Sequence, residues 1–283
     1  MSIKRVFTSL LLTLLLAGCL GVKFTYNNLD WVIPWYLDDY LVLDKGQDKN
    51  FDQQLDILWQ WHRTEELPQY SALFHEIIAD LDNQKVSHER LHYYTSQGDL
   101  FYTRIIHKSL EQGAPLIAQL SDQQITDLLD SIAEDDQDFK EYVAETDLQE
   151  RIKERRTSVA KTFKKWLGPL SKTQKKRIRN WSKETETSLE YHMEYVTKTR
   201  KVFKATLEQR QDQQQTKRKL FKLASQPELL RSKAYNETIE RNSQRFRQLL
   251  LDTVASLSKK QRTRLRNKML NYAEDFSELS KKT

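Results

Sequence analysis

Residues 170–180 read LSKTQKKRIRN, and residues 257–267 repeat the phrase as LSKKQRTRLRN. The same Leu-Ser-x-x-Gln skeleton occurs at residues 120–124, and a looser copy at residues 43–47 has Asp in place of Ser. In each copy, the Ser or Asp side chain can accept a hydrogen bond from the N3 amide of a helix, and Gln at N3 can bond the N-cap amide in return. An apolar residue lies eight positions after each Leu, at Phe51, Leu128, Ile178 and Leu265. The four copies therefore predict the starts of four amphipathic helices.

The rest of the chain is also typical of helices. Its 283 residues include only 6 Gly and 5 Pro, and 30 % are charged. Apolar positions recur three and four apart, as on one face of a helix. Gly98, the segment from Gly113 to Pro115, and Gly168-Pro169 are typical of helix ends. We predict an all-α, multi-helix bundle of about eight to ten helices, several of them long, with no significant sheet.

The chain begins MSIKRVFTSLLLTLLLAGCL. Two basic residues precede an apolar run that is too short to span a bilayer. Leu16-Ala17-Gly18-Cys19 resembles the lipobox of bacterial lipoproteins, which implies that residues 1–18 are a signal peptide and that Cys19 becomes the lipidated first residue. An ordinary signal peptide with a chance cysteine is the alternative. By the sorting rule of that family, Leu20 in place of Asp implies the outer membrane, with the protein on its periplasmic face.

The cysteine content and the distribution of charge limit the possible organisation of the mature chain. Cys19 is the only cysteine, so no disulfide can form within one chain. Residues 19–150 carry 9 basic and 26 acidic side chains, whereas residues 151–283 carry 35 basic and 14 acidic ones. We expect a short tether at residues 19–25, an acidic, aromatic-rich helical half at 26–168 and a basic helical half at 169–283. The halves form either two units or one continuous domain.

The repeated phrases concentrate positive charge near the predicted helix starts. Cations in a first turn oppose the helix macrodipole, so an acidic partner should compensate them. That partner is either the acidic half of the same molecule or an external anion, such as phospholipid or lipopolysaccharide head groups or an acidic envelope protein. The candidate anion- or partner-binding residues are Lys175, Lys176, Arg177, Arg179, Arg262, Arg264 and Arg266.

The sequence carries two further resemblances, one in its aromatic N-terminal segment and one in the repeated phrase. Residues 26–31 (YNNLDW), 35–40 (WYLDDY), 61–63 (WHR) and 66–70 (ELPQY) resemble a family of bacterial lipoproteins of unknown function, which implies an envelope location and helical architecture but no activity. The Leu-Ser-x-x-Gln skeleton resembles the LTxxQ motifs of periplasmic helical stress proteins of the Spy and CpxP type. That second resemblance implies a chaperone-like or stress-sensing role.

Within this segment, Trp31 with Trp35 and Tyr36 with Tyr40 are i, i+4 pairs that would share helix faces. One interpretation is a buried aromatic core, with nearby carboxylates of Asp30, Asp38 and Asp39 capping helices or pairing with Arg63. The other is a groove for apolar client segments, or an interfacial contact beside the lipid anchor.

Residues 88–92 read HERLH, which matches the H-E-x-x-H pattern of zinc metallopeptidases. In that chemistry His88 and His92 bind the metal, Glu89 is the general base, and Glu111 or His107 would be the third ligand. Against it, Arg90 adds a charge inside the motif, Ser87 predicts a helix start that leaves His88 in a frayed first turn, and no β-strand is predicted beside it. We expect no metal site here.

Taken together, these patterns favour a lipid-anchored outer-membrane protein with a non-enzymatic binding role in the cell envelope, chaperone-like or for envelope maintenance. A zinc metallopeptidase and a structural envelope scaffold are the alternatives. We expect no cofactor. The basic half lacks the interleaved aromatic residues typical of nucleic-acid binding, so the expected partners are the membrane, through the lipid, and an envelope protein client or anionic lipid.

Overall fold

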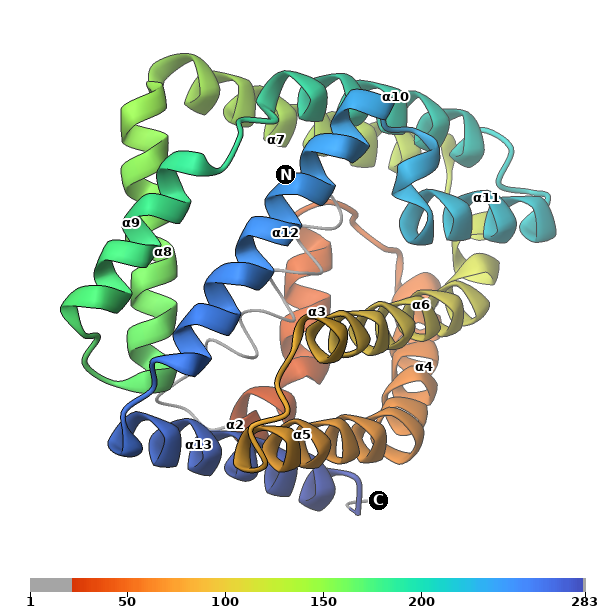
Figure 1. The fold of residues 1–283 in the computed structure, drawn as a ribbon. Helices are drawn as coiled ribbons and strands as arrows, with labels where there is room; N and C mark the ends of the chain where they lie inside the picture. The colour runs from red at the N-terminus through yellow and green to blue at the C-terminus, as the bar shows by residue number, and fades with distance from the viewer. Residues whose placement is uncertain (1–21, 282–283) are drawn as a thin grey trace.

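The computed structural model describes residues 22–281, and all of its regular structure is helical, with no strand in that range (Figure 1). The all-α prediction is therefore confirmed. The helices are α2 (Val22–Tyr26), α3 (Leu29–Asp38), α4 (Lys45–Trp61), α5 (Leu67–Asp82), α6 (His88–Gln119), α7 (Asp122–Glu145), α8 (Leu148–Leu167), α9 (Lys172–Glu184), α10 (Leu189–Leu207), α11 (Gln213–Ser225), α12 (Lys233–Ala255) and α13 (Lys259–Leu279). A π-helical turn, His62–Glu66, joins α4 to α5, and a 3-10 turn, Pro227–Leu229, precedes α12.

Three buried apolar clusters hold the helices together. The first joins α2 and α3 to α5 and α13, through Val22, Tyr26, Leu29, Leu67, Tyr272 and Leu279. The second joins α5, α8, α9, α12 and α13, through Leu81, Phe163, Leu167, Ile178, Leu249 and Leu265. The third joins the segments that precede α4 and α7 to α7 and α10, through Leu41, Leu120, Ile125 and Leu207. Helices of the acidic half thus pack on helices of the basic half, with α5 against α13 and α6 against α11.

The repeated phrase starts helices as predicted, because all four copies form complete capping boxes at α4, α7, α9 and α13. The boxes of α9 and α13 also bind each other. The Gln174 side-chain amide donates to Gln261 Oε1 over 3.1 Å, and the Gln261 amide donates to Gln174 Oε1 over 3.0 Å. Each amide donates a second bond to a backbone carbonyl before the partner helix, at Ser256 for Gln174 and at Pro169 for Gln261.

The other two boxes repeat this arrangement. Gln47 and Gln124 exchange side-chain hydrogen bonds of 3.2 and 2.6 Å, and their amides also donate to the carbonyls of Gln119 and Val42 respectively. Each glutamine thereby uses both of its amide hydrogens and accepts two bonds at its oxygen. The copies of the phrase are therefore a pairing device as well as a way to begin a helix.

The glycine-based helix ends are only partly confirmed. Gly168 does end α8, with a φ of 82° that favours glycine. The predicted breaks at Gly98 and at Gly113–Pro115 are wrong, because α6 runs through all of them. Neither Gly98 nor Gly113 has a neighbouring atom within 4 Å of the position a Cβ would take, so the surroundings do not require glycine there. Packing of α6 against α4 and α11 outweighs these weak local signals.

Within residues 22–281, no helix has both the length and the apolar character needed to cross a bilayer.

Candidate functional site: an aromatic face and a basic corner

Helix α3 presents a stripe of large aromatic side chains to solvent. Its buried side packs Leu29, Val32 and Ile33 into the first cluster, so the residues on the opposite side face outward. Trp31 is 67 % exposed and Trp35 is 61 % exposed, and Phe24 on α2 is 55 % exposed. We call these three residues the aromatic face. The expectation that the tryptophans form a buried core is therefore wrong, because the aliphatic stripe of α3 takes the buried side.

The two tyrosines of the candidate client groove lie differently from the tryptophans. The Tyr36 and Tyr40 hydroxyls are 3.2 Å apart, and the Tyr40 hydroxyl donates to Asp135 of α7 over 2.7 Å. Burial and the hydrogen bond to Tyr36 raise the pKa of the Tyr40 hydroxyl. Tyr36 and Tyr40 thus join the N-terminal segment to α7, whereas Trp31 and Trp35 are free to contact a partner.

The carboxylates near the aromatic face do not pair with Arg63, contrary to one expectation. The Arg63 guanidinium donates to the Asn27 side chain over 3.1 Å and lies 5.2 Å from the centre of the Tyr26 ring. The Asp30 carboxylate instead accepts a bond from the Trp31 backbone amide at the start of α3. The partner of Arg63 is thus the neutral side-chain amide of Asn27, which directly follows α2, and not one of the expected carboxylates.

Helix α2 is fixed to the body by a cage of half-buried aromatic side chains around the buried Tyr26. The Tyr26 ring stacks on Trp59 with centroids 4.2 Å apart, and its hydroxyl lies 2.9 Å from His62 Nδ1. His62 Nε2 lies 3.3 Å from the Tyr70 hydroxyl. Burial, with a smaller effect of the Arg63 charge, lowers the pKa of the His62 imidazole to about 4. This neutral histidine therefore links α2, α4 and α5.

An ion-pair cluster holds the outer side of α2. The Lys23 ammonium lies 3.3 Å from the Asp275 carboxylate and also binds Glu278, both on α13. The side-chain bond to Glu278 raises the pKa of Lys23. The first helix after Cys19 is thus attached to the last helix of the chain.

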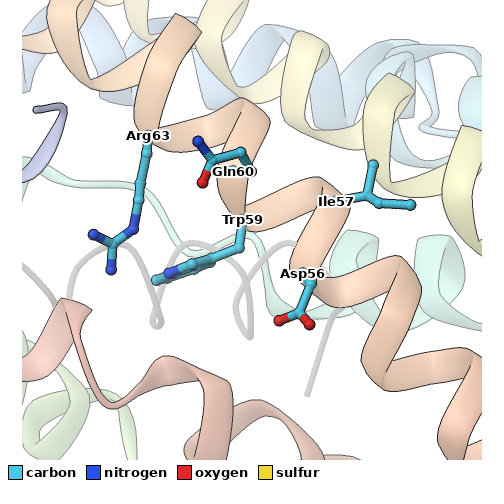
Figure 2. Close-up of a pocket in the computed structure, with 5 residues that line it drawn as sticks. All are labelled: Asp56, Ile57, Trp59, Gln60 and Arg63. Carbon is cyan, nitrogen blue, oxygen red and sulfur yellow. The ribbon is translucent and has the colours of Figure 1, made fainter. Parts of the chain in front are cut away.

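A shallow hollow lies beside the cage, lined by Asp56, Ile57, Trp59, Gln60 and Arg63 (Figure 2). Trp59 and Arg63 point to the same side of the helix, and Ile57 points away from them. An apolar group could rest on the Trp59 ring while an acidic group meets Arg63. Asp56 and Gln60 are new to the candidate site, because nothing in their sequence spacing distinguishes them from ordinary surface positions.

The candidate anion-binding residues separate into two sets. In the first, each arginine has an internal partner: Arg177 lies 3.8 Å from the Asp252 carboxylate, Arg266 lies 2.9 Å from Asp82, and Arg262 donates to the Leu81 carbonyl over 2.8 Å. The second set is exposed and consists of Lys175, Lys176 and Arg179 on α9 and Arg264 on α13. Internal pairing thus accounts for part of the positive charge.

Two further lysines of α13 lie beside this set: Lys260 is exposed, whereas Lys268 is half-buried, with its ammonium 3.3 Å from the Lys165 carbonyl and 5.2 Å from the centre of the Trp166 ring. Lys260, Arg264 and Lys268 are four residues apart and so share one helix face. Lys260 and Arg264, with Lys259 and Thr263, line a shallow hollow at the start of α13. We define the basic corner as Lys175, Lys176, Arg179, Lys260, Arg264 and Lys268. Lys260 and Lys268 were not among the predicted residues, although their i, i+4 spacing with Arg264 in the sequence could have indicated them.

The H-E-x-x-H segment lies in the first turn of α6, and Ser87 is its N-cap as expected. His88 Nε2 lies 3.1 Å from the Gln248 side chain, and Arg90 binds Glu76 and Asp80. His88, Glu89 and His92 are all exposed. No group of three or more His, Cys, Asp or Glu side chains that could hold a metal occurs among residues 22–281.

The proposed third metal ligands lie too far along the same helix. Glu111 follows His92 by 19 residues within α6, which places it about 28 Å away along the axis. His107 follows by 15 residues, or about 22 Å. Glu111 instead pairs with Lys108 over 3.1 Å, and this bond lowers the pKa of its carboxyl. Neither residue can therefore share a metal with His92.

The fold and these surfaces define an all-α protein with paired capping motifs and exposed contact faces. A family model described as a family of unknown function (DUF6279) matches residues 39–236, and the chain belongs to this family. The match runs from the residue after α3 into the first turn of α12, so it includes parts of both charge halves and omits α2, α3 and α13. No curated protein and no solved structure matches the chain.

Proposed function

We propose that the protein is a lipoprotein of the outer membrane, anchored through Cys19 on the periplasmic face, with a non-enzymatic binding role in the cell envelope. Cys19 lies outside the described residues, so the proposal begins from the lipobox resemblance at residues 16–19. Val22, the first residue of α2, follows Cys19 by only three positions. Three residues span at most about 11 Å, so an acyl chain on Cys19 would keep α2 close to the leaflet.

The observation that carries the proposal is the aromatic face beside this attachment point. Phe24 follows Cys19 by five residues, and Trp31 and Trp35 lie on the next helix. Tryptophan is enriched at membrane–water interfaces because its ring is amphipathic. Such exposed aromatic side chains are also suited to bind the apolar segments of a client protein. Either contact is a binding function and requires no catalytic group.

The anchor is tested by exporting the chain from residue 20 behind a signal peptide that is cleaved without lipidation. This form should move from the membrane fraction to the soluble periplasmic fraction, because the acyl chains supply most of the membrane affinity. The unaltered protein is the control and should stay with the outer membrane. If the unacylated form sediments with the outer membrane as completely as the control does, the proposed anchoring is wrong.

The binding role is tested with a client that aggregates on warming. The Trp31→Ser/Trp35→Ser variant should suppress aggregation less than the unaltered protein, because it loses the largest exposed apolar side chains of the face. Leu229→Ser is the matched control, since Leu229 is 65 % exposed but belongs to the 3-10 turn before α12. Equal suppression by all three proteins would exclude the aromatic face as the client site.

A further inference from the structure

The paired capping boxes bring two basic segments together that are 87 residues apart in the sequence. Lys175 directly follows Gln174, and Lys260 directly precedes Gln261, so both lysines flank the bonded glutamine pair. Ile178 of α9 and Leu265 of α13 lie in one buried cluster below the pair. The two helices begin at the same corner of the molecule, at the lower left of Figure 1. The cations that flank the glutamine pair, Lys175 and Lys260, therefore lie at one corner of the fold.

No carboxylate among the described residues compensates the charges of this corner, although the Lys268 ammonium contacts the Lys165 carbonyl and the Trp166 ring. None of its six cations forms an ion pair with a carboxylate among residues 22–281. The first turns of α9 and α13 contain no acidic residue, although acids are favoured there by the helix macrodipole. Burial and the neighbouring charges of Lys165 and Arg264 lower the pKa of Lys268. The cations repel one another, and a bound anion would relieve that repulsion.

On α13, the cations of the basic corner lie on the same helix face as the residue that binds α2. Asp275 lies two turns beyond Lys268 on α13, and the spacing of Lys260, Arg264, Lys268 and Asp275 keeps all four on one helix face. Asp275 is the residue that Lys23 of α2 binds. Arg264 precedes it by eleven residues, or about 16 Å of helix. The C-terminal end of this face therefore binds α2, and its N-terminal part carries the α13 cations of the basic corner.

We propose that the basic corner binds the phosphate groups of anionic lipid head groups in the leaflet that holds the lipid anchor. The choice of a lipid as the partner rests on the proposed function, because a leaflet attached at Cys19 would lie within reach of the same face of α13. Basic side chains near a membrane surface are attracted to acidic lipids, and the attraction weakens with added salt. The repeated phrase would then serve both to pair two helices and to gather their cations.

The experiment uses the unacylated chain from residue 20, which retains every described residue, and measures co-sedimentation with vesicles. Vesicles of phosphatidylcholine mixed with phosphatidylglycerol should bind it, vesicles of phosphatidylcholine alone should bind it much more weakly, and salt should remove the difference. The Lys175→Gln/Lys176→Gln/Lys260→Gln variant should lose at least about tenfold in affinity for the anionic vesicles, since each lysine contributes roughly fivefold.

The matched control is Lys201→Gln/Lys204→Gln/Lys222→Gln, which removes the same charge from exposed lysines of α10 and α11. It should bind anionic vesicles like the unaltered chain. Equal loss in both variants would overturn the proposal, as would binding to soluble polyglutamate in place of vesicles. Because this chain carries no acyl group, the result is independent of whether Cys19 is lipidated.

Discussion

At the residue level, His62 makes the stability of the fold depend on pH. The folded imidazole has a pKa of about 4, whereas the unperturbed value is 6.5. As pH falls from 6.5 to 4, the unfolded chain takes up a proton that the folded chain excludes, so the free energy of unfolding should fall by up to about 3 kcal/mol. Above pH 6.5 this contribution is complete and constant.

The His62→Gln variant checks this prediction by urea unfolding across the same pH range. It should be less stable at pH 7, and its free energy of unfolding should vary less between pH 6.5 and 4. Glu186 also has a shifted pKa, because the hydrogen bonds from Arg241 and Arg245 lower the pKa of its carboxyl to about 2. Its effect on stability occurs largely below pH 4, so it does not obscure the effect of His62. A pH profile with the same slope in both proteins would contradict the assignment to His62.

Single residues also show where sequence reasoning is limited. The N-cap residues Asp44, Ser121, Ser171 and Ser258 lie where the repeated phrase predicts them, because capping depends on side chains within one turn. The exposure of Trp31 and Trp35 could not be read in the same way. It depends on which stripe of α3 meets α5 and α13, and both stripes of this helix are apolar.

At the level of helices, the two glutamine pairs should contribute to stability as coupled units. In a double-mutant cycle, Gln174→Ala and Gln261→Ala should each destabilise the protein, and the double variant should be less destabilised than the sum by about 1–2 kcal/mol. The reason is that the first substitution already removes the bonds that join α9 to α13. Denaturant unfolding of the four proteins measures the coupling.

The control cycle combines Gln174→Ala with Gln47→Ala, which belong to different pairs. Their effects should add to within about 0.5 kcal/mol. If the effects add in both cycles, the capping boxes act separately, and the hydrogen bonds between paired glutamines contribute nothing to the free energy of unfolding.

Helix starts were more predictable than helix pairing or helix continuity. The four copies of the phrase predicted α4, α7, α9 and α13, but nothing in them selects Gln261 rather than Gln124 as the partner of Gln174. That choice depends on packing between segments far apart in the chain. The continuity of α6 through Gly98 and Pro115 has the same origin, since contacts with α4 and α11 hold it helical.

At the level of the whole molecule, the acidic and basic halves meet through a few specific ion pairs. Asp136 of α7 forms two hydrogen bonds of 2.9 and 3.1 Å with the Arg200 guanidinium of α10. Asp122 pairs with Arg210 over 2.6 Å. The charge asymmetry in the sequence thus indicated that the halves attract each other, but it could not show that the basic corner is left without an acidic partner.

The Asp136→Asn variant tests this attraction, because Asp136 and Arg200 are both mostly buried. Its free energy of unfolding should fall by roughly 1–2 kcal/mol, since a charged and bidentate interaction is lost. Asp138→Asn is the control, because Asp138 is exposed and forms no ion pair among the described residues; it should change stability by less than about 0.5 kcal/mol. Equal effects of the two substitutions would argue against a specific contact between the halves.

The proposed attachment to a membrane depends on the chemistry of one side chain, and mass spectrometry can read it directly. Trypsin should release the N-terminal peptide Cys19–Lys23 from protein purified from the outer-membrane fraction. We predict that this peptide begins at Cys19 and carries the mass of a diacylglyceryl group on sulfur. A chain that still begins at Met1, or a Cys19 peptide with a free thiol, would contradict it.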